Sequence, residues 1–374
     1  MIFPRALWHK PLSRIYDRMY VMESVKKDIR SLSLEDLLRL QVLQGKPKYH
    51  ARQLFRWLYK RDVSSFTEMT DLPHRLIESL DEKFYIGRLE CEKTLSADDG
   101  AEKFLFRLKD THSIETVLLR EKDRLTLCLS SQVGCKFGCP FCVSGAKGFV
   151  RNLTVSEITD QVLAVQRLRS VKATNLVMMG IGEPLDNYDR VTAALRIINH
   201  QEGIRLGARK MTISTCGIVP GIRRLKDLGL QVELSVSLHA ARDDLRDRLV
   251  PINRKYPLAK LLGVCRDYHK ATGRIITFEY AVMENINDSP DDARRLGELV
   301  YRQRGKANLI PCNANLSTAY HGAGDGKLRD FASRVRTTGA KVTIRNTKGR
   351  KILAACGQLA YSRHQGIGKP AVEK

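Results

Sequence analysis

Residues 135–142 read Cys135-Lys136-Phe137-Gly138-Cys139-Pro140-Phe141-Cys142, which places three cysteines in one short loop. This spacing can supply three thiolates to a metal centre. Iron–sulfur clusters usually take a full set of cysteine ligands, so a [4Fe-4S] cluster held by three of them keeps one iron open. An open iron can bind and reduce a small molecule, and we expect that molecule to be S-adenosylmethionine.

Two other kinds of cysteine site fit this loop less well. Zinc sites more often combine two short cysteine couples, or cysteine with histidine, and no second couple completes this loop nearby. Disulfide-stapled domains are short and secreted, whereas this chain has 374 residues, nine irregularly spaced cysteines and no secretory leader. The loop therefore favours a [4Fe-4S] cluster bound by Cys135, Cys139 and Cys142.

Composition and charge limit the class of protein. The chain is 43% hydrophobic and 28% charged, and it is long enough for a large barrel-type domain and a smaller accessory one. No apolar stretch approaches the length of a membrane span, so we expect no membrane association and a cytoplasmic location. The formal charge of +23 is spread along the chain and favours a polyanionic partner, with RNA as the first candidate.

The N-terminal part of the chain divides into two expected segments. Residues 1–21 carry basic residues that interrupt any export signal, and we expect a disordered extension there. Residues 22–98 predict a helical, RNA-binding accessory domain, with a first helix capped by Ser33. In residues 45–61 cations and aromatic residues are interleaved, so that cations can hold phosphates while rings stack on unpaired bases. Alternatively, the rings form the core of this small domain and the cations face water.

Short apolar, often β-branched runs alternate with segments of helical length within residues 99–362. The runs are residues 125–130, 175–180, 211–215, 232–237, 275–280, 307–311 and 341–345. Such alternation implies parallel strands joined by helices. We therefore predict an α/β fold, a partial (βα)6 TIM-like barrel preceded by a β extension, with residues 363–374 as a tail.

Chemistry in such barrels gathers at the carboxyl ends of the strands, and polar residues stand at those ends here. A glycine pair lets the backbone approach a ligand closely, and an acidic side chain suits a methionine ammonium group. Serine, histidine and asparagine would form a polar rim for ribose and carboxylate groups, although each also has an ordinary role as a turn, cap or core residue. The residues expected to bind S-adenosylmethionine are Gly182, Glu183, Ser214, Ser237, Leu238, His239 and Asn313.

Several longer motifs carry a resemblance to a known family. They are the cluster loop and residues 128–135 (CLSSQVGC), 151–154 (RNLT), 182–185 (GEPL), 237–239 (SLH), 250–253 (VPIN) and 354–359 (AACGQL). Between residues 25 and 362 the chain resembles the RlmN/Cfr family of radical-SAM RNA methyltransferases, which implies a radical-SAM barrel. Among radical-SAM enzymes, the distant Cys356 together with Cys128 points to this family.

The resemblance implies a two-stage methyl transfer. The thiolate of Cys356 first takes a methyl group from one S-adenosylmethionine. A second S-adenosylmethionine, bound to the open iron, is cleaved to a radical that takes a hydrogen from this methyl group, and the carbon joins adenine in a protein–RNA crosslink. Cys128 or Glu115 then removes a proton from the base, and a Cys128–Cys356 disulfide releases the methylated RNA. Two cofactor molecules are used for each methyl group.

The resemblance also implies the substrate. The run Glu183-Pro184-Leu185 is similar to the branch that methylates adenine C2 in 23S rRNA and in tRNA, although residues 311–314 depart from the usual pattern of that branch. The alternatives are the Cfr-like branch, which modifies C8 and confers antibiotic resistance, and a noncatalytic zinc-containing RNA-binding protein. Basic residues between 345 and 351 would draw the phosphate backbone toward Cys356. We further expect a reducing protein of flavodoxin or ferredoxin type as a partner, and a monomer.

Overall fold

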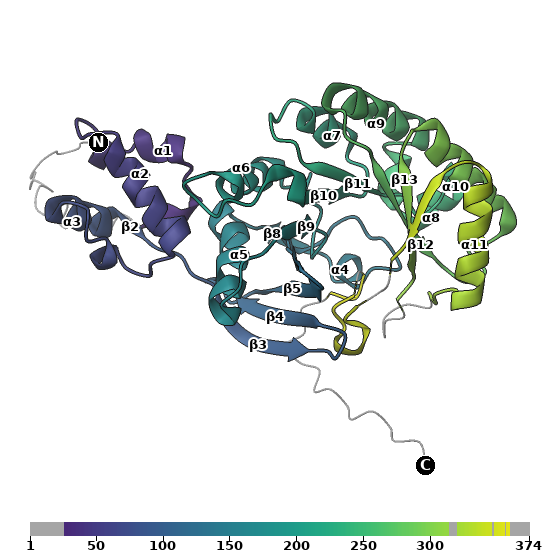
Figure 1. The fold of residues 1–374 in the computed structure, drawn as a ribbon, viewed down its shortest axis with the longest axis horizontal. Helices are drawn as coiled ribbons and strands as arrows, with labels where there is room; N and C mark the ends of the chain where they lie inside the picture. Colours follow the sequence, from purple (N-terminus) through teal and green to yellow (C-terminus); the bar gives the residue numbers. More distant parts are fainter. Residues whose placement is uncertain (1–25, 314–319, 346–347, 356, 360–374) are drawn as a thin grey trace, which may run out of the picture.

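The computed structural model describes residues 26–313, 320–345, 348–355 and 357–359, and its core is a sheet of ten strands (Figure 1). Seven neighbouring strands of this sheet run parallel. In spatial order they are β6 (Arg124–Cys128), β9 (Asn175–Met178), β10 (Met211–Thr215), β11 (Glu233–Ser237), β12 (Thr277–Val282), β13 (Lys306–Pro311) and β14 (Lys341–Ile344). Each predicted apolar run forms one of these strands. The predicted α/β barrel fold is confirmed, and the seven runs form seven parallel strands, one more than a (βα)6 barrel has.

Helices join successive parallel strands and cover the outside of the sheet (Figure 1). Two of the longest begin at capping boxes, in which Thr154 pairs with Glu157 and Ser289 pairs with Asp292. These side chains satisfy amide groups that the start of a helix leaves unpaired. The connecting helices are α5 (Val155–Arg169), α6 (Tyr188–Asn199), α7 (Val219–Leu225), α8 (Asp243–Leu249), α9 (Leu258–Thr272), α10 (Pro290–Arg302) and α11 (Asp325–Thr337).

Three antiparallel strands extend the sheet beyond β6. They are β3 (Glu90–Ser96), β4 (Ala101–Arg107) and β5 (Ser113–Glu121). Phe104 and Phe106 of β4 are fully buried, which anchors this extension in the hydrophobic core. Since β3 pairs with β4, the sheet begins at Glu90, within the segment expected to be helical.

A small helical unit precedes the sheet and lies at one end of the molecule (Figure 1). It comprises β1 (Lys27–Asp28), α1 (Leu34–Leu38), α2 (Tyr49–Arg56), a π-helical turn (Trp57–Arg61), α3 (His74–Lys83) and β2 (Phe84–Tyr85). Ser33 caps α1 as predicted, through a capping box with Asp36. The helix is short because Leu40 has an extended backbone, with ψ at 133°, and a 3-10 turn follows.

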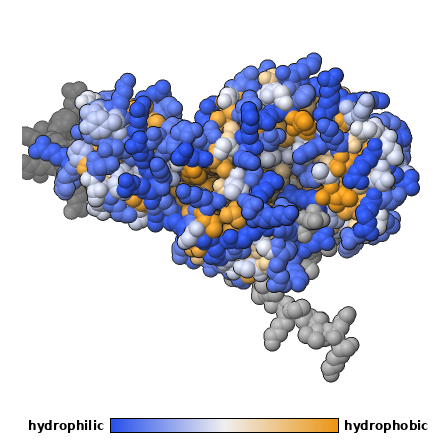
Figure 2. All heavy atoms as spheres, viewed as in Figure 1, coloured by the Kyte–Doolittle hydropathy of each residue, from blue (hydrophilic) through white to orange (hydrophobic). Residues whose placement is uncertain are grey.

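The aromatic residues of α2 and the turn after it belong to the core of this unit. Phe55, Trp57 and Tyr59 are 1%, 7% and 2% exposed, so they are not available to stack on bases. The basic residues of the same segment, such as Arg52 and Lys60, are exposed. The expectation of base-stacking rings is therefore wrong for these three residues, and the alternative, core rings beneath solvent-facing cations, is what the structure contains. On the face drawn in Figure 2 this unit is largely hydrophilic, whereas apolar residues gather over the barrel.

A buried arginine fastens the helical unit to the barrel. The side chain of Arg30 is fully buried, and its guanidinium donates to the Asp160 carboxylate of α5 at 2.7 Å and to Asp62 at 2.6 Å. It also donates to the carbonyl oxygens of Val63, at 3.0 Å, and Gly87, at 3.3 Å. Removing one partner from such a buried network leaves an uncompensated charge. These contacts thus hold the helical unit against the barrel.

No helix within the described ranges combines the length and apolarity needed to cross a bilayer. The expected N-terminal extension, residues 1–21, and the expected tail, residues 363–374, lie outside the described residues.

Candidate active site

The cysteine loop is closed at its base by two short strands. β7 (Gln132–Gly134) pairs with β8 (Phe149–Asn152) in an antiparallel ladder, and the Cys135 amide donates to the Gly148 carbonyl at 2.8 Å. Gly134 has φ of +74°, and a Cβ atom there would lie 1.9 Å from the Gly148 oxygen, so a side chain at this position would separate the two strands. A one-turn helix, α4 (Val143–Ala146), follows the last cysteine directly.

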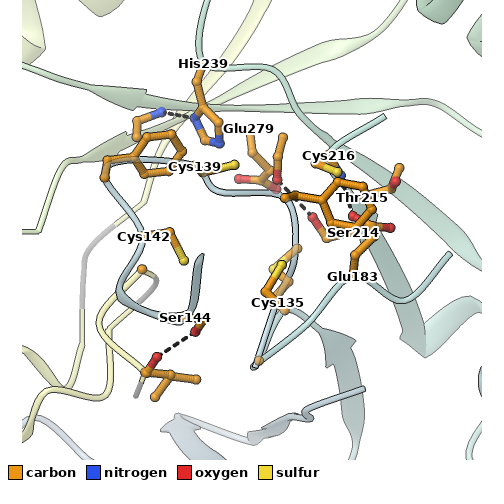
Figure 3. Close-up of a pocket in the computed structure, with 18 of the residues that line it drawn as sticks. Cys135, Cys139, Cys142, Ser144, Glu183, Ser214, Thr215, Cys216, His239 and Glu279 are labelled. Carbon is orange, nitrogen blue, oxygen red and sulfur yellow. Dashed lines mark hydrogen bonds between the residues drawn. The ribbon is translucent and has the colours of Figure 1, made fainter. Parts of the chain in front are cut away.

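The three cysteines line one cavity at the carboxyl ends of the parallel strands. Figure 3 shows Cys135, Cys139 and Cys142 spaced along the loop around this cavity, with Glu183 and Ser214 beside it. Burial raises the pKa of Cys135 to about 11, and burial also raises the pKa of Cys139. Thiols in this setting stay protonated unless a cation compensates the thiolate charge, which a metal centre does. Three soft sulfur donors around a shared cavity therefore fit an iron–sulfur cluster.

Gly182 and Glu183 lie where the chain leaves β9, and both line the cavity. Gly182 has φ of +102°, and a Cβ atom there would lie 2.5 Å from the Gln132 side chain. The glycine therefore lets the backbone at this position lie close to Gln132, the first residue of β7. The Glu183 carboxylate accepts from the amides of Cys216, at 2.7 Å, and Leu185, at 3.0 Å. Burial raises the pKa of Glu183, while these hydrogen bonds oppose the rise. A carboxylate has lone pairs beyond these two, so Glu183 can still accept from an ammonium group.

The other predicted strand-end residues divide between cavity and core. Ser214, Ser237, His239 and Asn313 line the cavity, and the hydroxyl oxygens of Ser214 and Ser237 are 3.5 Å apart. The His239 Nδ1 atom accepts from the Ala281 amide at 2.9 Å, so the neutral ring carries its proton on Nε2. Burial, reinforced by the Arg246 charge, lowers the pKa of His239 to about 3 and keeps the ring neutral. Leu238 is fully buried in the hydrophobic core, outside the cavity lining, and its backbone amide donates to the Glu279 carbonyl at 2.9 Å.

Sequence reasoning missed several residues that line the cavity. Ser144, Thr215, Cys216 and Glu279 are among them (Figure 3). Glu279 lies on β12 in register with Ser237 of β11, so the alternation of side chains along a strand could have indicated it. Its carboxylate accepts from the Asn308 amide at 2.7 Å, and burial raises its pKa.

The C-terminal segment of the described chain returns to the cysteine loop. The Val143 amide, directly after Cys142, donates to the Gly357 carbonyl at 3.0 Å. The buried Ser144 hydroxyl donates to the Leu359 carbonyl at 2.6 Å (Figure 3). Gly357 and Leu359 also line the cavity. Cys356 itself lies outside the described residues, but the residues that follow it in the chain are bonded to the cluster loop.

A second cavity lies on the other side of this segment. Cys128, Ala354 and Ala355 line it, and so do the basic residues Arg345 and Lys348. Its wall shares three residues with the first cavity, which are Met179, Ile310 and Leu359. Ala355 lines the second cavity, Gly357 lines the first, and Leu359 lines both.

Glu115 is buried on β5, close to this second cavity but outside its lining. It lies two residues from Val117, which pairs with Cys128 in the ladder between β5 and β6. The Lys103 ammonium lies 3.1 Å from the Glu115 carboxylate and donates to the Leu353 carbonyl at 3.0 Å. Glu115 is thus linked through Lys103 to the start of the segment that carries residues 354–359.

Comparison with protein families gives two matches. Residues 27–86 match the ribosomal RNA large subunit methyltransferase N-terminal domain, and residues 129–296 match the radical SAM superfamily. The first match covers the helical unit, and the second covers the cysteine loop and most of the parallel strands.

Individual proteins are similar over nearly the whole chain. The dual-specificity RNA methyltransferase RlmN of Geobacter sulfurreducens is 45% identical over 332 residues, which are 89% of this chain and 91% of that protein. A probable dual-specificity RNA methyltransferase RlmN of Clostridium perfringens is 40% identical and covers 91% of this chain and 99% of its own length. The crystal structure of a radical SAM methyltransferase from Sphaerobacter thermophilus superimposes with a TM-score of 0.84 at 41% identity, over 89% of this chain and 99% of that one.

Proposed function

The chain belongs to the RlmN family of radical-SAM RNA methyltransferases, and we propose that it methylates C2 of adenine in 23S rRNA and in tRNA. Its similarity to dual-specificity RNA methyltransferases over about nine tenths of the chain supports both classes of RNA as substrates. RNA substrates in turn favour a cytoplasmic location.

The observation that carries this proposal is the position of the described residues on either side of Cys356 in the chain. Ala355 lines the cavity that contains Cys128, and Gly357 lines the cavity that contains the three cluster cysteines. A thiol between these two residues has the chain position that a methyl carrier needs, because it must meet the methyl donor on one side and the RNA base on the other. This supports Cys356 as the residue that carries the methyl group.

The first cavity would hold the cofactors. Cys135, Cys139 and Cys142 would bind one [4Fe-4S] cluster, which when bound supplies the electron that cleaves S-adenosylmethionine. The surrounding side chains would orient that molecule: Glu183 accepts from its ammonium group, and His239 donates from Nε2. The full set proposed to bind it is Gly182, Glu183, Ser214, Ser237, Leu238, His239 and Asn313, with Leu238 contributing through its backbone.

The second cavity would hold the target adenine. The Cys356 thiolate accepts a methyl group and later delivers its carbon to C2 of the base, so that two molecules of S-adenosylmethionine are used for each methyl group. Cys128, which lines this cavity, would take the C2 proton as a thiolate. After losing this proton, it would attack the Cys356 sulfur, which forms a disulfide and breaks the carbon–sulfur bond of the crosslink; the electron pair of that bond stays with the carbon, which takes up a proton to complete the methyl group. Glu115 lies behind this wall, and we propose that it positions Lys103 and, through it, the methyl-carrier segment.

Positive charge would guide RNA to this cavity. Arg345 and Lys348 line it, and exposed cations on α2, such as Arg52, lie on the helical unit, residues 27–86. Charge-driven contacts of this kind add affinity without selecting sequence. We further propose that the protein acts as a monomer and takes its electrons from a flavodoxin or ferredoxin.

Isotope labelling tests the site of methylation. RNA fragments and tRNA carrying deuterium at adenine C2 would be methylated in vitro, digested and analysed by mass spectrometry, with C8-deuterated RNA as the matched control. We expect the C2 deuterium to be lost and the C8 deuterium to be kept. Retention at C2 with loss at C8 would overturn the C2 assignment and identify a Cfr-like enzyme.

The metal content and two variants test the chemistry. Anaerobically purified protein should be brown and contain iron, whereas a colourless zinc protein would favour a noncatalytic RNA-binding role. Cys356→Ala should abolish methylation, and Cys128→Ala should accumulate a covalent protein–RNA complex. Full methylation by the Cys356→Ala variant would show that Cys356 is not the methyl carrier.

A further inference from the structure

Arg246 of α8 is a charged residue with an unusual set of partners. Its side chain is fully buried, and every acceptor it contacts is neutral. Nε donates to the Leu238 carbonyl at 3.1 Å, and Nη1 donates to the Asn253 side chain at 2.8 Å. Nη2 donates to the carbonyls of Cys216, at 2.7 Å, and Ser237, at 3.2 Å.

Among the described residues, no carboxylate forms an ion pair with Arg246. Asn253 separates Arg246 from the two acids of this network, since its Nδ2 atom donates to the carboxylates of Asp243 and Asp247, each at 2.8 Å. A buried ion without a counter-charge costs several kcal/mol. Hydrogen bonds to carbonyl groups reduce this cost but leave the positive charge in place. The surroundings of Arg246 therefore favour a negative group nearby.

The cavity beside Arg246 is where such a group would sit. Cys216, whose carbonyl accepts from Arg246, lines the cavity with the three cluster cysteines. Ser237, whose carbonyl also accepts from Arg246, lines the same cavity. In a cluster site the three thiolates outweigh the two positive charges of an oxidised [4Fe-4S] core. The site then carries a net negative charge, which increases when an electron is added.

We propose that Arg246 is the counter-charge of the iron–sulfur cluster: it stabilises the electron that the cluster accepts from its flavodoxin or ferredoxin donor, while its hydrogen bonds fix the ends of β10 and β11. This inference rests on the proposed cluster but not on the RNA substrate. Arg246 acts through the cluster and the strand ends, so it is a positioning residue.

The test is a potentiometric titration of the purified holoenzyme, followed by electron paramagnetic resonance, without RNA or S-adenosylmethionine. Arg246→Gln removes the charge, and Arg246→Lys keeps it with fewer hydrogen bonds. We expect the midpoint potential of Arg246→Gln to shift to more negative values and that of Arg246→Lys to stay near wild type. Arg274→Gln is the matched control. The Arg274 guanidinium is paired with Glu233 at the start of β11, whereas Arg246 bonds to carbonyl groups at the end of this strand. Its midpoint should not change.

A purely structural role predicts a different result. Both Arg246 variants would then weaken S-adenosylmethionine binding, measured by equilibrium dialysis. The midpoint potential of Arg246→Gln would equal that of wild type, and this result would overturn the proposal.

If Arg246→Gln does not load iron, the exposed Asp243 supplies a second variant. Asp243→Asn should move the midpoint to more positive values, since Arg246 becomes less compensated, and an unchanged midpoint there would also overturn the proposal. Neither result depends on which RNA atom is methylated.

Discussion

Replacing Ser144 with alanine should loosen residues 357–359, which follow the proposed methyl carrier Cys356, without unfolding the barrel. The Ser144 hydroxyl is 6% exposed and donates to the Leu359 carbonyl at 2.6 Å. Leaving a buried acceptor without its partner costs about 1–3 kcal/mol. That free energy corresponds to a decrease of roughly 5- to 150-fold in the population of the docked segment.

The lower part of this range is the expected result, because a neighbouring hydrogen bond survives. The Val143 amide still donates to the Gly357 carbonyl at 3.0 Å, and Leu359 remains buried. Single-turnover methylation of RNA at saturating S-adenosylmethionine measures the effect, and the rate should fall by about 5- to 20-fold. Unfolding by denaturant should change little, since the segment is a small part of the core.

Ser79→Ala is the matched control for this experiment. The Ser79 hydroxyl also donates to a backbone carbonyl, that of Arg75 at 2.8 Å, but in a solvent-exposed turn of α3. Water replaces such a bond, so its rate should stay within about twofold of wild type. A wild-type rate for Ser144→Ala, at full iron content, would refute the idea that this hydroxyl holds the segment in place.

Three further predictions address the helical unit and the pH response. Arg30→Met removes the guanidinium that joins Asp62 to Asp160 but leaves both carboxylates in contact with Arg167, so it should lower the free energy of unfolding by about 1.5–3 kcal/mol in denaturant titrations; a decrease below about 1 kcal/mol would contradict the docking role of Arg30. His239 has a folded-state pKa of about 3, whereas its ordinary pKa is 6.5. Between these pH values the unfolded chain binds more protons than the folded one. The free energy of unfolding should therefore fall as the pH drops below 6.5, by up to about 1.4 kcal/mol per pH unit. His239→Gln should flatten this dependence, and equal slopes in the two proteins would refute it. Replacing the exposed Lys48 and Arg52 with glutamine should reduce the salt dependence of RNA affinity by about 0.7 in log–log slope for each phosphate that is no longer neutralised; an unchanged slope would mean that neither side chain binds phosphate.

Local patterns in the sequence predict most of the barrel. The β-branched runs around Ile213 and Val236 are strands because such side chains suit a buried parallel sheet. Ser33 marks a helix start correctly because a cap depends on residues only a few positions away. The end of α1 has no comparable local signal: the helix ends at Leu38, and the backbone at Leu40 is extended.

Contacts between distant parts of the chain are what the sequence does not reveal. Nothing near Arg30 indicates that its partner is Asp160, 130 positions away. Likewise, the bond between Ser144 and Leu359 joins positions 215 apart. Leu238 is a similar case, because β11 ends at Ser237 and His239 has φ of +57°, so the alternation of an extended strand does not continue through this motif. The burial of Leu238 in the core could therefore not be deduced from the sequence.

The ladder between β7 and β8 has a consequence for the order in which the protein matures. Because backbone hydrogen bonds already join Cys135 to Gly148, the entropy of closing the cysteine loop is offset by the polypeptide itself. Small zinc domains, by contrast, often cannot fold until their ion arrives. In this protein the pairing of β7 with β8 would close the base of the cysteine loop without help from a metal, so we expect iron and sulfide to bind cysteines that the backbone already holds together.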